Sequence, residues 1–470
     1  MWKDDFSIDF NIVFNRKNRG YQQVFNSFST VTKIFTTMKD SHSINELKER
    51  MASGKEVFCS GLFLSARWFA LAGAASPGIN LIVLPDRDSA EYCSSDLYSL
   101  IDGDRVFFLP VSGKSVERSN YKSSLGVQRT SAVNSIMNWK PGSPALFIVS
   151  WPEALEEPVP DRSRISGAVL NLRKGEEISR DKIVEVLAAQ NFTKTDFVSA
   201  PGQFAVRGSI IDIFSFSDSH PFRISFFGDE VENINMFDCN TQLSREVRDE
   251  ASIFPDIIAG DNSEGGVPVS GILPQDTVVW LDSSDMYRER EFFSRLSPFR
   301  KVYLETPLSA VKASPIRFDI SPQPAFNKNF DLLIQDIKNR LEKGYKVYIY
   351  GEKRSQLERL RSIILAEEGT VPEMVEGKNL HNGFIDHESR CCIYSDHEIF
   401  DRFHRVRMRR SVEKSEQLTI NELSSFNIGD YVVHIDYGVC VFGGLVRMKD
   451  DRGRMHEVVK LMFKDNDTIF

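Results

Sequence analysis

The chain has 470 residues, with 58 Lys and Arg against 66 Asp and Glu, which gives a formal net charge of −8. This length is enough for about three or four domains. Hydrophobic residues make up 41% and charged residues 26%, an ordinary balance for a globular protein that excludes a mostly disordered chain. The acidic balance disfavours a protein whose whole surface binds nucleic acid, although local basic patches remain possible.

The cysteines and the apolar runs indicate the compartment. None of the six cysteines forms a C-x-x-C pair, and the adjacent Cys391 and Cys392 would point to opposite faces of a strand. We therefore expect reduced thiols, no metal site and a cytoplasmic protein. The N-terminus lacks the cationic start and apolar core of a signal peptide. The long uncharged run from Trp68 to Pro85 is broken by Ser76-Pro77-Gly78, so we expect helix, turn and strand instead of a membrane span.

Residues 1–151 alternate short apolar strands with helical patterns. Continuous apolar strands separated by helices are typical of a parallel sheet covered on both faces, so we predict a doubly wound α/β domain. The expected helices are Ser43–Met51, Leu62–Ala74 and Asp86–Leu100, and the expected strands are Glu56–Ser60, Asn80–Leu84, Arg105–Leu109 and Ala145–Val149.

Residues 152–245 differ in residue pattern from residues 1–151 and are predicted to form an inserted α+β module. A helix is expected over Ser179–Gln190, capped by Ser179. Two stretches rich in β-branched and aromatic residues follow, Gln203–Phe214 and Pro221–Phe237, and Gly228-Asp229 is expected to form a hairpin turn in the second. The first domain is then expected to resume over residues 246–312.

The remaining residues are assigned to two further units. Residues 313–410 are predicted to form a small α/β domain, and 411–420 a linker. Residues 421–470 contain three expected antiparallel strands, which indicates a small β-barrel. The pattern stops at Phe470 in mid-strand, so we expect this chain to be part of a longer protein.

The loop after the first predicted strand lies where a phosphate-binding loop would lie. Such a loop needs glycines for close backbone approach, a Lys for the β- and γ-phosphates and a Ser or Thr for magnesium. Here Gly61 is kept, but Ala66, Arg67 and Trp68 stand at the second Gly, the Lys and the Ser/Thr positions. We expect a degenerate nucleotide loop that no longer supports hydrolysis.

A basic cluster ends the small α/β domain. It has two interpretations, a solvated face paired with acidic residues, or a docking patch for an acidic protein or nucleic acid. The cluster consists of Arg402, Arg405, Arg407, Arg409 and Arg410.

Three motifs together carry a resemblance to a known family. Pro201–Phe214 and Pro221–Val231 resemble the damage-recognition modules of UvrB and of transcription-repair coupling factors. Gly429–Leu445 is similar to the RNA-polymerase-interacting barrel, of SH3/Tudor-like type, shared by the coupling factors and CarD-type regulators, which UvrB lacks. The order of the motifs resembles the N-terminal part of a transcription-repair coupling factor, and the resemblance covers roughly residues 50 to 470.

The resemblance implies two binding sites. The UvrB-like module is expected to bind UvrA through Lys194 and Arg207, with Phe214 as an apolar companion. The barrel is expected to bind the β subunit of RNA polymerase by strand addition through Val458, Val459, Lys460 and Leu461. The alternative for Val459 and Leu461 is that they fill the barrel core.

The resemblance also implies which functions belong to this chain and which belong to domains beyond it. Binding of stalled polymerase and recruitment of UvrA fall to this chain, which is expected to need no cofactor and to have no enzymatic activity. ATP, magnesium and translocation on double-stranded DNA belong to motor domains beyond it. The alternatives are a UvrB-type DNA-damage ATPase or helicase, disfavoured by the degenerate loop, and a CarD-like transcription regulator, disfavoured by the UvrB-like motif.

Overall fold

The computed structural model describes residues 41–101, 103–112, 119–161, 163, 167–218, 220–239, 241–256, 266–310, 313–367, 369–377, 380–402, 428–434, 438–449, 455–463 and 468–469. The chain divides into two compact units, Met1–Ser411 and Val412–Phe470, each considered by itself below. Within the described ranges, no helix is both long enough and apolar enough to cross a membrane.

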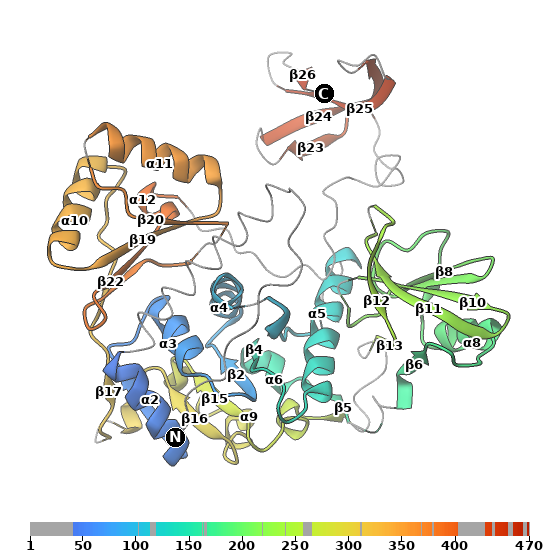
Figure 1. The fold of residues 1–470 in the computed structure, drawn as a ribbon, viewed down its shortest axis with the longest axis horizontal. Helices are drawn as coiled ribbons and strands as arrows, with labels where there is room; N and C mark the ends of the chain where they lie inside the picture. The colour runs from blue at the N-terminus through green and yellow to red at the C-terminus, as the bar shows by residue number, and fades with distance from the viewer. Residues whose placement is uncertain are drawn as a thin grey trace, which may run out of the picture. The chain divides into compact units, whose positions relative to one another are not determined.

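A parallel sheet of seven strands forms the centre of the first unit (Figure 1). Its central strands β2 (Ile79–Val83) and β4 (Leu146–Ser150) are buried at every residue, as expected for strands covered on both faces. The strand order is β17 (Ile316–Arg317), β1 (Glu56–Ser60), β16 (Arg300–Tyr303), β15 (Val278–Leu281), β2, β4 and β3 (Val106–Phe108).

Helices cover both faces of this sheet. One face packs against α2 (His42–Ser53), α3 (Ala66–Ala74) and α4 (Arg87–Leu100). The other face packs against α5 (Ser119–Asn138) and the short helices α6 (Pro152–Glu156) and α9 (Glu291–Ser294). The predicted parallel α/β architecture is confirmed, and so is the helix, turn and strand reading of 68–85. Short 3-10 helices lie in the connections, η1 Gly103–Arg105, η2 Val269–Gly271, η3 Ser284–Met286 and η4 Leu308–Ala310.

The segment between β4 and β15 builds a separate six-stranded sheet. Helix α8 (Arg180–Ala189) packs Ile183 and Leu187 onto one face, and the β10–β11 hairpin turns at Gly228, whose φ of 64° suits glycine. The strands in order are β12 (Ser244–Arg248), β11 (Glu230–Phe237), β10 (Phe222–Phe227), β9 (Ile210–Ile213), β8 (Gln203–Arg207) and β7 (Thr193–Lys194).

Two short antiparallel ribbons lie where this segment leaves and rejoins the parallel sheet. The outer ribbon pairs β5 (Val159–Pro160) with β14 (Gly266–Val267). The inner ribbon pairs β6 (Leu170–Arg173) with β13 (Glu250–Ile253). The segment therefore enters and leaves at one place.

A five-stranded mixed sheet follows in the first unit. Strands β22 (Cys391–Ser395), β19 (Lys346–Gly351) and β20 (Glu373–Glu376) are parallel, whereas β18 (Ile320–Pro322) and β21 (Phe384–Asp386) run antiparallel to their neighbours. Ile316–Arg317 pairs with β1 in the first sheet, beyond the predicted boundary at 312/313. The elements are β18 (Ile320–Pro322), α10 (Phe330–Glu342), β19 (Lys346–Gly351), α11 (Arg354–Ala366), β20 (Glu373–Glu376), β21 (Phe384–Asp386), β22 (Cys391–Ser395) and α12 (Asp396–Ile399).

The second unit is an antiparallel sheet of four described strands. They are β23 (Tyr431–His434), β24 (Gly438–Lys449), β25 (Met455–Met462) and β26 (Thr468–Ile469), and a bulge interrupts the β24–β25 register between Phe442 and Leu445. Closure of this sheet into an SH3/Tudor-like barrel stays a prediction. The predicted linker 411–420 lies outside the described residues.

Candidate functional site

The loop at Gly61 is closed by the chain's own backbone. Gly61 follows β1 and has a φ of 70°, a conformation that favours glycine. A Cβ atom there would lie 2.3 Å from the carbonyl oxygen of Phe318. The glycine therefore permits close approach of the segment after β17, in the place where a phosphate-binding loop would receive its ligand.

The three substituted positions of this loop are engaged in packing. Ala66 and Trp68 are almost fully buried in the core under α3. Arg67 donates from Nη1 to Asp282 Oδ1 at 2.6 Å and from Nε to the Leu64 carbonyl at 3.0 Å, and its guanidinium stacks on Trp68. The Arg67 guanidinium is thus paired with the Asp282 carboxylate, and the Trp68 indole fills space in the core.

Residues from the small α/β domain cover the N-terminus of α3. Ser65 donates from Oγ to Asp96 Oδ2 at 2.6 Å and accepts a hydrogen bond from the Asn382 N–H at 3.0 Å. The His381 N–H donates to the other Asp96 oxygen at 2.7 Å. Asp96 is fully buried, and this burial raises the pKa of its carboxyl to about 7.

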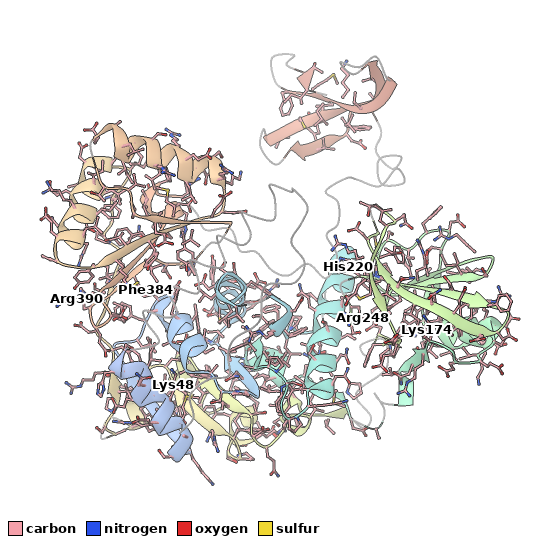
Figure 2. The ribbon with its side chains drawn as sticks, in the orientation of Figure 1. Lys48, Lys174, His220, Arg248, Phe384 and Arg390 are labelled. Carbon is pink, nitrogen blue, oxygen red and sulfur yellow. The ribbon has the colours of Figure 1, made fainter. Side chains whose placement is uncertain are left out.

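Aromatic packing strengthens the same junction. Phe69 of α3 contacts Phe384, labelled in Figure 2, and Tyr350, with ring centroids 5.2 and 6.4 Å apart. The His381 ring stacks on Tyr92, and burial lowers its pKa to about 4. The Arg67 and Trp68 N–H groups at the start of α3, which would face phosphate in an active loop, bind the Leu64 and Ser65 carbonyls instead.

The predicted UvrA-binding residues have three different environments. Lys194 is exposed on β7, and Arg207, at the end of β8, keeps 36% of its side chain exposed. Phe214 is fully buried, so its side chain is not available to a partner and this part of the prediction is corrected. The exposed aromatic ring beside Arg207 is Phe197, with the guanidinium carbon 4.7 Å from the ring centroid.

The sequence reasoning missed both Phe197 and the carboxylate that holds Arg207. Asp212 of β9 has no exposed side-chain surface and pairs with Arg207 and with Arg223 of β10. A signal existed, because an Asp within the apolar stretch Ile210–Ile213 requires cationic partners if it is buried.

The predicted polymerase-binding residues lie on β25. Leu461 pairs with the buried Phe442, and opposite residues share a face, so Leu461 and Val459 face the core side of the sheet. Val458 and Lys460 alternate to the other side. In the described residues, β26 pairs only with Leu461 and Met462. Val458–Lys460 thus have a strand on one edge only in this part of the chain.

Of the predicted basic cluster, Arg402 alone lies in the described residues. Its Nη2 is 3.3 Å from Asp396 Oδ2, and its guanidinium stacks on Phe400. Arg402 therefore fits the solvated, paired interpretation. Arg405, Arg407, Arg409 and Arg410 lie outside the described residues.

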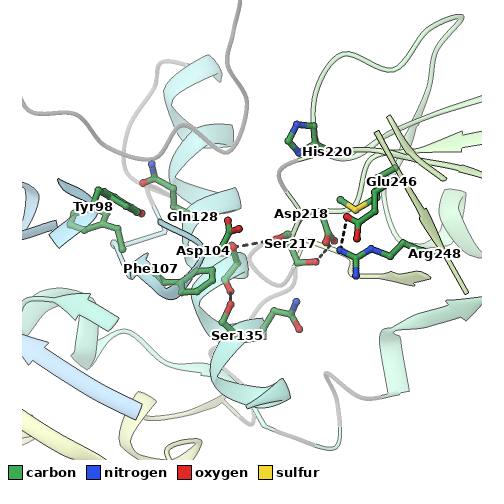
Figure 3. A pocket seen from close by; sticks show the side chains of 14 residues that line it. Tyr98, Asp104, Phe107, Gln128, Ser135, Ser217, Asp218, His220, Glu246 and Arg248 are labelled. Carbon is green, nitrogen blue, oxygen red and sulfur yellow. Dashed lines mark hydrogen bonds and ion pairs between the residues drawn. The ribbon is translucent and has the colours of Figure 1, made fainter. Parts of the chain in front are cut away.

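A cavity of about 440 Å³ is lined by α5 on one side and by the inserted segment on the other (Figure 3). Ser131 of α5 donates to the Ser217 carbonyl at 3.1 Å, and both residues line the cavity. Its lining is mainly polar. It includes Tyr98, Asp104, Phe107, Gln128 and Ser135 from the parallel-sheet domain, and Ser217, Asp218, His220, Glu246 and Arg248 from the inserted segment.

Comparisons with known proteins match two segments of the chain to family models. Residues 170–257 match the UvrB interaction domain, and residues 426–470 match the CarD-like/TRCF RID domain. The first match covers the whole six-stranded inserted sheet, and the second covers the described C-terminal sheet.

Curated relatives named transcription-repair-coupling factors match between 47% and 94% of the chain. A transcription-repair-coupling factor of Borreliella burgdorferi is 20% identical over 89% of this chain and 42% of its own length. One of Staphylococcus aureus is 20% identical over 94% of this chain and 46% of its own length. One of Bacillus subtilis is 30% identical over 47% of this chain and 19% of its own length. The chain thus spans less than half the length of these relatives and resembles part of a transcription-repair coupling factor, as the motifs predict.

Proposed function

We propose that this chain is the N-terminal, partner-binding part of a transcription-repair coupling factor, which binds RNA polymerase stalled at DNA lesions and recruits UvrA. One observation carries the proposal: a UvrB interaction domain and a CarD-like/TRCF RID domain follow each other in one chain. The UvrB-type alternative accounts for the first match only, and the CarD-like alternative for the second only.

Each partner is assigned to one module. UvrA binds the inserted six-stranded sheet through the surface that carries Lys194 and Arg207, because exposed cations steer association and fix the register of a protein interface. The β subunit of RNA polymerase binds β25. Its edge at Val458–Lys460 suits strand addition, which supplies main-chain hydrogen bonds.

Nucleotide chemistry is assigned to the rest of the coupling factor. The buried Trp68, the paired Arg67 and the segment 380–384 over α3 support a chain that neither binds nor hydrolyses ATP. ATP and magnesium then serve motor domains that move on double-stranded DNA, and the cytoplasm is the compartment where the polymerase partner is found.

The decisive experiment is retention of purified partners by the full 470-residue chain. We expect the chain to retain both UvrA and RNA polymerase. Arg207→Glu should abolish UvrA binding while polymerase binding stays unchanged, and the melting temperature should fall because the substitution removes a cation that pairs with the buried Asp212. Arg245→Glu is the matched control, because Arg245 is also exposed on the inserted sheet and paired with an aspartate, Asp238. If the Arg207→Glu chain still retains both partners, Arg207 is not part of the interface. If the unaltered chain fails to retain UvrA or fails to retain RNA polymerase, the proposal is refuted.

A further inference from the structure

The outer face of the inserted sheet carries a buried carboxylate between two arginines. Ala205, Asp212 and Arg223 are directly opposite one another on β8, β9 and β10, and opposite residues share a face. Arg207 and Ile210 are the next pair on the same face. The other face carries Ile211, Ile213 and Ile224 into the core. Asp212 is thus a buried acid on the side of the sheet that faces away from that core.

Both arginines are held by this acid. Arg223 donates to Asp212 from Nε at 2.8 Å and from Nη2 at 2.9 Å, a two-pronged contact that fixes the orientation of both groups. Arg223 also donates to the Gln242 carbonyl and to its side-chain oxygen. Arg207 donates to the same carboxylate from Nη2. The charges of the three groups sum to +1, so the acid is fully neutralised and a positive excess remains at the surface.

A second support lies on the face of the Arg207 guanidinium. The Phe197 ring is 61% exposed and stacks under Arg207. The turn that carries this ring is fixed on one side by Thr195, whose Oγ1 donates to the Phe197 carbonyl at 3.1 Å. On the other side, the Gln203 side chain accepts from the Ser199 and Ala200 N–H groups. The backbone that carries Phe197 is therefore fixed, and its exposed ring, called the Phe197 platform below, supports the Arg207 guanidinium.

Arg207 keeps donors for a partner. Among the described residues, its Nε and Nη1 make no hydrogen bond, whereas Nη2 is bound to Asp212. The contact with Asp212 and the stacking on Phe197 fix the direction of the guanidinium. Nη2 carries a second proton, which together with the Nε–H or an Nη1–H forms a two-donor edge that matches a carboxylate, because a carboxylate accepts two parallel hydrogen bonds.

We infer that Asp212 is a positioning residue, which orients Arg207 on the Phe197 platform so that the pair receives a carboxylate flanked by an apolar group on the partner protein. This inference rests on the proposed function, because it takes UvrA as that partner. Asp212 touches no partner itself and acts through Arg207. The selectivity of the surface then comes from geometry as well as from its positive charge.

The variant Asp212→Asn separates geometry from charge. It raises the charge of the three-residue cluster from +1 to +2, so simple attraction of an acidic partner would become stronger. Loss of the ionic anchor for Arg207 should instead weaken UvrA binding about tenfold, the size expected for a hydrogen bond to a charged group. In an Arg207→Ala background the same substitution should have no effect on binding, because two residues that act through one contact are not additive.

The surface ring provides a second variant that does not depend on the buried acid. Phe197→Ala should weaken UvrA binding about three- to tenfold through loss of the cation–π contact and of apolar area. Arg207→Lys should also weaken it, since the ammonium keeps the charge but neither the fork nor the stacking. Tyr431→Ala, an exposed aromatic residue of the other unit, is the matched control and should bind UvrA like the unaltered chain.

The positioning role is tested by measuring the equilibrium dissociation constant of each variant for purified UvrA, together with its melting temperature. Absence of binding by the unaltered chain would overturn the proposed function. Binding by the unaltered chain, with equal or tighter binding by a folded Asp212→Asn chain, would overturn the positioning role alone. If Asp212→Asn does not fold, Phe197→Ala and Arg207→Lys decide, and unchanged binding by both would overturn the inference.

Discussion

The buried carboxyl of Asp96 makes the stability of the first unit depend on pH in a direction opposite to that of an ion-paired acid. Its hydrogen bonds with Ser65 and His381 and the charge of Arg67 favour the ionised form, but burial outweighs them. The pKa rises from 3.8 to about 7. A carboxyl whose pKa is raised on folding contributes most stability when protonated, and that contribution is lost as the pH rises through the folded pKa.

The magnitude follows from this shift. About three pKa units correspond to about 4 kcal/mol over the full titration. Between pH 5 and pH 8 the unfolded carboxyl is already ionised while the folded one titrates near pH 7, so about 2.5 kcal/mol falls in this window. Asp96→Asn removes the titration with little change of shape. The amide oxygen can still accept from the His381 N–H, and the Ser65 hydroxyl can rotate to accept from the amide.

Urea denaturation of the unaltered chain and of Asp96→Asn at pH 5, 6, 7 and 8 measures the effect. The free energy of unfolding of the unaltered chain, relative to that of the variant, should fall by about 2.5 kcal/mol from pH 5 to pH 8. His381 has its pKa lowered to about 4 by burial, so its stabilising contribution is lost as the pH falls below about 6.5. That contribution is common to both chains and cancels. A difference between the two chains that stays constant across the range would refute the reasoning.

Three further predictions concern the degenerate loop and its surroundings. Trp68→Ala should lower the free energy of unfolding by about 3–5 kcal/mol, because it empties a buried site in the core, and a loss under about 1 kcal/mol in urea denaturation would contradict this. Gly61→Ala should lower the free energy of unfolding by more than about 1 kcal/mol, since its φ is 70° and the Phe318 carbonyl blocks the new Cβ. Gly142 also has a positive φ but has open space around it, so Gly142→Ala is the control and should lower the free energy of unfolding less in the same denaturation series. Calorimetric titration with ATP should give no binding signal, and a micromolar signal that disappears on Arg67→Ala would show that the loop still binds nucleotide.

Four strands of the parallel sheet, β1, β2, β3 and β4, could be predicted because they are short and mostly apolar, whereas β16 and β17 carry charged residues and were not predicted. Ile79–Val83 and Leu146–Ser150 are short, apolar and bounded by turn residues, so burial on both faces follows from the pattern. The helix 180–189 could be predicted in the same way, from Ile183 and Leu187 on one side. Local periodicity is enough for such elements, because the core they face is implied by their own residues.

The proposed UvrA-binding surface could be predicted only in part. Arg207 and Lys194 follow from a motif, but Phe214, which the same motif offered as an apolar companion, is buried after β9. Phe197 stands in the polar stretch Thr195–Ser199 and looks like an ordinary loop residue until the β7–β8 pairing brings it beside Arg207. The contact of Asp96 with His381 joins residues far apart in the chain, and no local pattern encodes such a contact.

The two antiparallel ribbons at the base of the inserted sheet determine how force reaches it. The β5–β14 and β6–β13 ribbons are the covalent entry and exit of the whole segment, and each pairs an incoming strand with an outgoing one. A force on any strand of the inserted sheet reaches the parallel sheet through these ribbons, and also through the Ser131–Ser217 hydrogen bond with α5. The shorter ribbon has two residues in each strand and the longer one has four, so under load the shorter ribbon should separate first.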